Sequence, residues 1–176
     1  MPHKKENRIV FFLDLDNLRL NTDFLTEKQI SITAGFDRIQ RQIIKDIGGE
    51  ITRVFVFASS PHLTSTEAEA FYNQGFYVIA CPRIKSKEGE DEDTVDELLM
   101  EFLKEEVSLV PGITHICLGS GDKDFCRALR RVMRKGLKLI VVARDLSSLS
   151  QDLIDVADTN PLTEKKMVYV FSPTAD

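Results

Sequence analysis

Two hydrophobic runs of the chain each end in a short acidic motif. The run at 8–13 (RIVFFL) leads into the motif at 14–17 (DLDN), and the run at 113–118 (ITHICL) leads into the motif at 119–124 (GSGDKD). Apolar, β-prone runs of this length indicate strands that are buried on both faces of a parallel sheet. Because sites form where the strands of open α/β sheets end, both motifs are candidates for a site, and carboxylates gathered there suggest a divalent metal.

The rest of the chain alternates strand-like and helix-like segments. Apolar, β-prone runs predict strands at 8–15, 51–58, 76–81, 113–118, 137–143 and 167–171. Apolar positions at helical spacing, together with capping signals, predict helices at 33–47, 64–75, from 94 onward, 123–135 and 148–157. The segment at 18–31 is predicted to be a long connection, and the charged segment at 85–93 an exposed loop. Strands alternating with helices specify an α/β fold, a three-layer α/β/α sandwich around a mostly parallel sheet.

Length and composition fit a single globular domain over residues 1–176. With 176 residues, of which 43% are hydrophobic, the chain is large enough for one well-buried core. No stretch approaches the roughly 20 apolar residues of a membrane span, and the N-terminus lacks the apolar run of a secretory signal. We therefore expect a cytoplasmic protein with no membrane partner. The three cysteines have no CxxC spacing and lie in or beside apolar segments, which indicates reduced core residues.

Charge is unevenly distributed along the chain. The net charge of −5 argues against a protein that coats nucleic acid nonspecifically, because such binding needs many phosphate contacts from Lys and Arg. Ten acidic residues lie between Glu88 and Glu106, whereas six basic residues lie between Arg127 and Lys138. One molecule can therefore present both an acidic and a basic face.

The carboxylates of the two motifs repel one another if they share a site. Asp14 and Asp16 have the period-2 spacing of one strand face, and Asp122, Asp124 and a helical acid near residue 96 add to the repulsion. Either these groups lie apart, some are protonated, or a cation lies among them. A hard cation such as Mg²⁺ or Mn²⁺ prefers oxygen ligands, which suits an Asp cluster.

Each acidic motif also has a purely structural interpretation. Asp and Asn after a strand are common turn formers, and Asp122 stands where it can cap the helix that follows. Asp93 and Asp96 lie near a helix start, where Thr94 and Glu97 have capping-box spacing and acids are favoured in any case.

Other kinds of site have less support in the sequence. A GxxxxGK[ST] phosphate loop is absent, and the pair Gly119 and Gly121 lacks the third glycine of a dinucleotide fingerprint. His3, His62 and His115 are isolated, so we interpret all three as structural or surface residues.

With these motifs the chain resembles the NYN domain family, a branch of the PIN-like metal-dependent ribonucleases. The resemblance rests on four motifs in family order, at 12–17 (FLDLDN), 95–96 (VD), 120–125 (SGDKDF) and 150–158 (SQDLIDVAD). It implies a PIN-like, Rossmann-like parallel sheet with acidic residues at the carboxyl edge of the strands. It also implies Mg²⁺ or Mn²⁺ as cofactor and hydrolysis of RNA phosphodiester bonds.

The resemblance also implies roles for single acidic positions. Asp14 and Asp122 look like principal metal ligands, and Asp96 looks like the helical acid of the family. Asp124 would complete the cluster. Because acidic residues are inserted before the helix, Asp93 is the alternative to Asp96.

Three further positions match the family's motifs. Asn17 looks like the polar residue that orients a ligand or a substrate phosphate. Ser120 resembles the small hydroxyl residue that supports the site, and Asp158 matches an outer position.

The leading hypothesis is a metal-dependent ribonuclease. In this hypothesis the cation activates a water for in-line attack and offsets charge on the phosphate oxygens. Arginines of the predicted helix at 123–135 are candidates to hold the RNA backbone, namely Arg127, Arg130, Arg131 and Arg134. A basic, solvated helix face is the ordinary alternative for these four residues.

Two rival hypotheses use the same residues differently. One is a noncatalytic RNA-binding or scaffolding protein of the same fold. The other is a phosphatase of the haloacid dehalogenase type, with Asp14 as the phosphorylated nucleophile and Asp16 as the acid/base. Leu18 weakens the phosphatase hypothesis, because those enzymes usually have Thr or Val at that position. The sequence leaves open the identity of the RNA and the oligomeric state, including a homo-oligomer.

Overall fold

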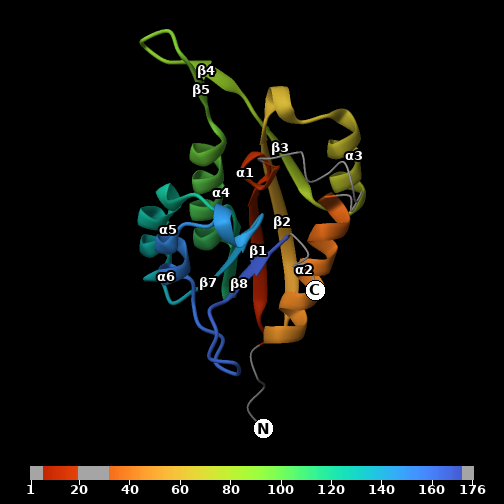
Figure 1. Cartoon of the computed structure of the whole chain (residues 1–176), viewed down its shortest axis with the longest axis vertical. Helices are drawn as coiled ribbons and strands as arrows, with labels where there is room; N and C mark the ends of the chain where they lie inside the picture. Colours follow the sequence, from red (N-terminus) through yellow and green to blue (C-terminus); the bar gives the residue numbers. More distant parts are fainter. Residues whose placement is uncertain (1–5, 20–31, 172–176) are drawn as a thin grey trace.

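A parallel sheet forms the centre of the computed structural model, which describes residues 6–19 and 32–171 (Figure 1). Its strands are β1 (Arg8–Asp14), β2 (Glu50–Ser59), β3 (Tyr77–Cys81), β6 (His115–Gly119), β7 (Lys138–Ala143) and β8 (Val168–Val170). They lie in the order β3-β2-β1-β6-β7-β8, and every neighbouring pair is parallel. The predicted α/β fold with a mostly parallel sheet is confirmed.

Helices cover both faces of the sheet and make three layers (Figure 1). One face carries α1 (Leu15–Arg19), α2 (Ile32–Ile47) and α3 (Ser65–Asn73), and the other carries α4 (Val95–Leu109), α5 (Cys126–Met133) and α6 (Gln151–Val156). Short 3₁₀ helices lie between them, namely η2 (Ser60–His62), η3 (Lys123–Phe125) and η4 (Leu146–Ser148). Among the described helices, none combines the length and apolar character that crossing a bilayer requires.

Alternating side chains of β1 build the two hydrophobic cores. Phe11 and Leu13 point to one face, where they join Phe36 of α2 in one buried cluster. Phe12 points to the other face and joins Leu99 of α4 in the second cluster. All five side chains are at most 1% exposed, because β1 lies in the middle of the sheet and is covered from both sides. The rigid centre of the molecule therefore ends at Asp14.

The direction of winding reverses between β1 and β6. From β1 the chain moves outward to β2 and β3, then returns to β6 on the other side of β1 and moves outward again to β7 and β8. In open α/β sheets, ligands bind at such a reversal, at the carboxyl ends of the two central strands. Leu13 of β1 pairs with Gly119 of β6, so the two acidic motifs follow these strands side by side.

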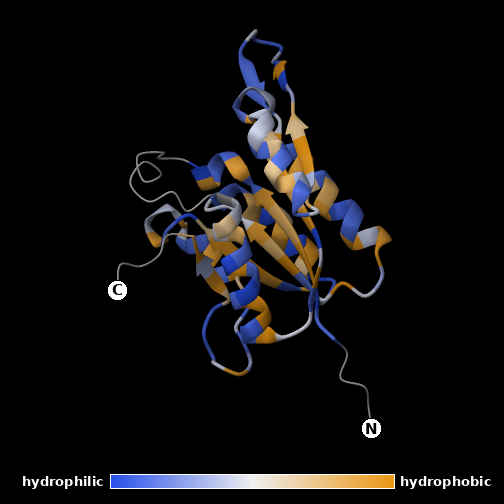
Figure 2. Ribbon diagram, turned by 90° about the vertical axis from the view of Figure 1, so that its right-hand side faces the viewer, coloured by the Kyte–Doolittle hydropathy of each residue, from blue (hydrophilic) through white to orange (hydrophobic). Residues whose placement is uncertain are grey.

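Two segments differ from the predicted elements. The first strand ends at Asp14, and Leu15–Arg19 turn at once into α1, so Asp14 and Asp16 do not share a strand face. The predicted loop at 85–93 is exposed but carries a β-hairpin, with β4 (Arg83–Lys85) paired to β5 (Asp91–Asp93). Figure 2 shows this hairpin projecting beyond the body of the molecule. The predicted connection at 18–31 lies outside the described residues from position 20 onward.

The predicted capping box at the start of α4 is wrong. The Thr94 hydroxyl donates instead to the Pro82 carbonyl at 2.6 Å, across the base of the hairpin. The N-terminus of α4 is served by Asp93, whose Oδ1 accepts the Val95 backbone N–H at 2.8 Å. The tertiary contact at Pro82 therefore overrides the local capping signal.

Gly121 lies against backbone that leaves no room for a side chain. A Cβ added there would be 2.0 Å from the Ser148 carbonyl oxygen. The neighbouring Ser150 N–H donates to the Gly121 carbonyl at 3.2 Å, which holds the two loops together. Since the close atom belongs to the backbone, the clash cannot be relieved by a side-chain rotation.

Gly121→Ala is therefore expected to lower the free energy of unfolding by about 2 kcal/mol, because the loop at 119–122 must move away from Ser148. Chemical denaturation of wild-type and variant protein measures this change. A variant as stable as the wild type would contradict the close approach of the two loops.

Candidate functional site

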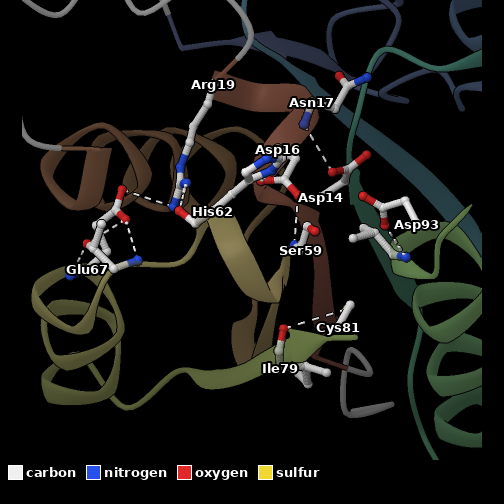
Figure 3. Close-up of polar contacts among 12 residues, drawn as sticks. Asp14, Asp16, Asn17, Arg19, Ser59, His62, Glu67, Ile79, Cys81 and Asp93 are labelled. Carbon is white, nitrogen blue, oxygen red and sulfur yellow. Dashed lines mark hydrogen bonds and ion pairs between the residues drawn. The ribbon is translucent and has the colours of Figure 1, made fainter. Parts of the chain in front are cut away.

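Asp14 is a buried carboxylate at the end of the central strand. Its side chain is 5% exposed, and its Oδ1 accepts the Asn17 backbone N–H at 3.0 Å (Figure 3). The pKa of Asp14 is raised from 3.8 to about 7, chiefly by burial and also by the negative charges of Asp96 and Asp16, although hydrogen bonds from Asn17 and Ser120 lower it. A carboxyl group with this pKa binds protons or cations near neutral pH.

Backbone-to-side-chain hydrogen bonds tie the second acidic motif to the first. Asn17 Oδ1 accepts the Gly121 N–H at 2.9 Å, which joins α1 to the loop after β6. Ser120 is fully buried, donates its hydroxyl to Asp14 Oδ2 at 3.4 Å and accepts the Asp122 N–H at 3.2 Å. The observed contacts of Asn17 and Ser120 therefore hold the two motifs against each other.

Asp96 faces the same site from the first turn of α4. Asp96 is exposed, yet partial burial of its carboxyl group, together with the charges of Asp122, Asp93 and Asp124, raises its pKa from 3.8 to about 6. Of the neighbouring charges, that of Asp96 raises the pKa of Asp14 most. The sheet and α4 thus bring together the acids that the sequence analysis singled out.

The remaining acids have visible structural partners. Asp122 is half-buried, and its Oδ1 accepts the Asp124 N–H at 2.9 Å, which is the capping role that the sequence also allowed. Asp124 is exposed. Asp93 is exposed and accepts a hydrogen bond from the N-terminus of α4. Of the two alternatives for the helical acid, Asp96 is the one whose charge raises the pKa of Asp14.

The donor set fits a hard divalent cation that keeps much of its water. Among residues 6–19 and 32–171, no three His, Cys, Asp or Glu side chains stand close enough together to hold a metal ion between them. Mg²⁺ is commonly bound by one or two carboxylates, with water and substrate phosphate as the other ligands. Asp14 and Asp96 provide oxygen donors with raised pKa values, which a bound positive charge would lower.

The four candidate arginines are exposed but are not equally placed. Arg127 lies in the first turn of α5, next to the acidic loop, and Arg130 and Arg131 follow in its last turns. Arg134 comes seven residues after Arg127, about 10 Å farther along the helix. The neighbouring Lys135 bonds Ser108 at the far end of α4, so Arg134 lies at the opposite edge of the sheet from Asp96.

Asp158 also lies at the edge of the sheet away from the acidic loops. Its Oδ2 accepts the Leu139 N–H at 2.7 Å, close to the start of β7. This hydrogen bond anchors the beginning of a strand, whereas the acidic site lies where strands end. The predicted outer site position is therefore structural.

A second cluster of polar side chains lies beside the acidic site, at the carboxyl ends of β1 and β2, and was not predicted from the sequence. Asp16 Oδ2 accepts the Ser59 N–H at 2.7 Å, and Asp16 Oδ1 lies 3.5 Å from His62 Nδ1 (Figure 3). Arg19 donates to the His62 carbonyl at 2.6 Å and pairs with Glu67 at 2.9 Å. His62 is exposed, in keeping with its interpretation as a structural or surface residue, but the sequence carries no sign of this contact, because only the pairing of β1 with β2 brings His62 to Asp16.

The raised pKa values of Asp14 and Asp96 give stability a defined pH dependence. Both carboxyls hold protons in the folded state that the unfolded chain releases above about pH 4. The free energy of unfolding therefore falls as the pH rises from about 4 to about 7.

Asp14→Asn is expected to remove most of this slope and to raise the free energy of unfolding at pH 8 by about 2 kcal/mol in the absence of divalent metal. Denaturation at a series of pH values in EDTA measures both effects. Asp37→Asn, an exposed position on α2, serves as the control. An Asp14→Asn variant that is less stable than the wild type at pH 8 would contradict the inference that the buried Asp14 charge destabilises the folded protein.

Comparison with known proteins supports the fold and places the chain in a family. A solved structure of a protein of unknown function from Vibrio parahaemolyticus RIMD 2210633 has a TM-score of 0.66 at 21% identity, with 97% of this chain and 95% of that chain covered. A structure from Clostridium difficile 630, described as a PLP-bound aminotransferase, has a TM-score of only 0.29 at 12% identity and covers 64% of this chain and 27% of that chain. No curated protein sequence matches the chain.

The model of the NYN domain matches residues 8–162, which is most of the chain. This match spans every acidic position described above, and the fold agrees with the PIN-like architecture expected for such domains. NYN domains form a PIN-like, nuclease-type family. The chain therefore belongs to the NYN domain family.

Proposed function

We propose that the chain is a metal-dependent ribonuclease that hydrolyses RNA phosphodiester bonds with Mg²⁺ or Mn²⁺. The observation that carries the proposal is the buried Asp14 carboxylate at the winding reversal of the sheet, with its pKa raised to about 7 beside the charge of Asp96. Burial of an unpaired charge is unfavourable, and a bound cation offsets it. Family membership in the NYN domains agrees with this chemistry.

In the proposal, Asp14 and Asp122 would bind the ion, directly or through water, Asp96 would act on it through water, and Asp124 adds negative charge at the exposed side of the site. When bound, the cation supplies a water activated for in-line attack and a positive charge beside the phosphate oxygens. Asn17 and Ser120 contribute indirectly, because their hydrogen bonds fix the Asp14 carboxylate and the loop of Asp122.

Asp96 is the carboxylate best suited to accept the proton of the attacking water. It is exposed to solvent, so a proton taken from the attacking water can pass on to bulk solvent during turnover. Asp14 is less suited to this role, since its side chain is buried and already bonded to Asn17.

RNA is the proposed partner, and the cytoplasm the proposed location. The net charge of −5 makes tight nonspecific binding unfavourable, so the substrate backbone needs basic side chains close to the acidic site. Arg127 is placed for this contact by the first turn of α5, with Arg130 and Arg131 behind it. Arg134, at the far end, is the natural control position.

The phosphatase hypothesis loses its support. The chain belongs to the NYN domain family, and Asp16 is bonded to the Ser59 N–H and lies against His62 instead of standing beside Asp14 on a strand. A noncatalytic RNA-binding protein of the same fold remains the alternative outcome of the cleavage experiment.

Cleavage of an end-labelled structured RNA in Mn²⁺ tests the proposal. Wild-type protein is expected to cleave it, and Asp122→Asn to cleave at least about 100-fold more slowly, because a metal-binding carboxylate is lost. Arg127→Ala should weaken cleavage through substrate binding, whereas Arg134→Ala should match the wild type.

Equal cleavage by wild type and Asp122→Asn would indicate a contaminating nuclease and contradict the proposal. RNA binding in EDTA without cleavage in Mn²⁺ would instead support the noncatalytic alternative.

Metal binding has its own readout in thermal unfolding. Saturating Mn²⁺ is expected to raise the unfolding temperature of the wild type by about 5 °C or more, since a ligand that binds only the folded state stabilises it by mass action. Asp14→Asn should lose this shift, and Asp37→Asn should keep it. A shift of the same size in all three proteins would place the ion elsewhere.

A further inference from the structure

Polar side chains of the described residues flank the acidic site on its β2 side, across the site from the basic helix α5. This flank is formed by Asp16 and Arg19 of α1, His62 of η2 and Glu67 of α3 (Figure 3). Three separate segments meet here because β1 and β2 are neighbours, so that α1 and η2 leave the sheet at the same edge. In Figure 3 His62 and Asp16 lie on one side of Asp14, and Asp93 lies on the other.

The backbone that carries His62 is held from both sides. Leu63 N–H donates to the Ser59 carbonyl at 3.2 Å, and Arg19 donates to the His62 carbonyl at 2.6 Å. The Arg19 guanidinium also pairs with Glu67, and its side chain is only 14% exposed. Arg19 is thus committed to structural contacts, and it fixes the position of His62.

The His62 ring is oriented by a carboxylate that is itself anchored. Asp16 is bonded through Oδ2 to the Ser59 N–H, and its other oxygen lies 3.5 Å from His62 Nδ1. An imidazole whose Nδ1 faces a carboxylate directs Nε2 away from it. The His62 side chain is 54% exposed, whereas the Asp16 side chain is 22% exposed. The ring is therefore open to solvent while a less exposed, hydrogen-bonded carboxylate holds its orientation.

An RNA strand that reaches the acidic site needs donors beside it. Asp14, Asp96, Asp122 and Asp124 repel the backbone phosphates on either side of the one at the metal, and Arg127 offers a positive charge only on the α5 side. On the β2 side Arg19 is turned toward backbone and Glu67, so among the described residues the donor is the exposed His62 ring in its protonated form. A protonated imidazole donates from both ring nitrogens, so Nε2–H can bind a phosphate oxygen while Nδ1–H faces Asp16.

We propose that His62 is an RNA-phosphate contact on the β2 side of the site and that Asp16 is its positioning residue. This inference rests on the proposed ribonuclease function and extends it to a phosphate next to the scissile one. His62 would then contribute to substrate binding and to the path of the strand across the carboxyl edge of β2, β1 and β6.

Binding of an end-labelled single-stranded RNA oligonucleotide in EDTA tests the contact without cleavage. His62→Ala is expected to raise the Kd about fivefold, because one hydrogen bond to a phosphate is lost. His62→Arg should restore wild-type affinity and steepen the salt dependence relative to His62→Ala, with a change of about 0.7 in the slope of log K against log salt. Asn73→Ala, exposed at the far end of α3, is the matched control and should bind as the wild type does.

The role of Asp16 is tested by a double-mutant cycle. Asp16→Asn keeps an acceptor for the Ser59 N–H but removes the charge that orients the ring. It should weaken RNA binding about twofold when His62 is present and should not weaken it in the His62→Ala background. In Mn²⁺, His62→Ala should raise KM and leave kcat close to the wild-type value, as expected for a contact made equally in ground and transition states.

The outcomes separate this inference from the proposed function. Wild-type RNA binding and cleavage, with His62→Ala indistinguishable from Asn73→Ala, would overturn the phosphate contact and leave the ribonuclease proposal standing. Failure of His62→Arg to restore binding would likewise overturn it, since a phosphate contact requires only a suitable donor. Absence of RNA binding by the wild type at low salt would overturn the proposed function, and the contact with it.

Discussion

The burial of one carboxylate governs the arrangement of this site. Asp14 ends a strand that is covered on both faces, so its charge lies where water reaches it poorly. Desolvation and, to a smaller extent, the charge of Asp96 on a different element together raise its pKa to about 7. Two hydrogen bonds from Asn17 and Ser120 offset only part of this cost. Because the fold keeps this carboxylate buried, a cation that binds beside it would offset the unfavourable free energy of its charge.

The surrounding structure maintains that arrangement through backbone contacts. Asn17 accepts a hydrogen bond from the Gly121 N–H, and Gly121 in turn lies against the Ser148 carbonyl. The segments after β1, β6 and β7 are therefore each in contact with the next. Position 121 tolerates no side chain, which explains why glycine stands between Ser120 and Asp122. The acids are therefore held by rigid elements, as a site needs if its geometry is to persist without ligand.

Much of the fold could be predicted from local patterns, because each buried strand is a continuous apolar run and each long helix has a clear periodicity. The acids after β1 and β6 were found for the same reason, since they follow those runs directly. α1 was missed because its five residues are too few to show a helical period. The hairpin was missed because its strands are charged and exposed, and its register pairs Arg83 with Asp93 and Lys85 with Asp91.

Contacts between distant segments could not be predicted. The Asp16 and His62 pair depends on the order of β1 and β2 in the sheet, and Thr94 is drawn from its capping position by Pro82. The decisive measurement is the titration of the Asp14 carboxyl carbon by ¹³C NMR, with and without Mg²⁺. We expect a pKa of about 7 in EDTA and a value well below this in Mg²⁺. An ordinary pKa in EDTA, unchanged by Mg²⁺, would contradict it.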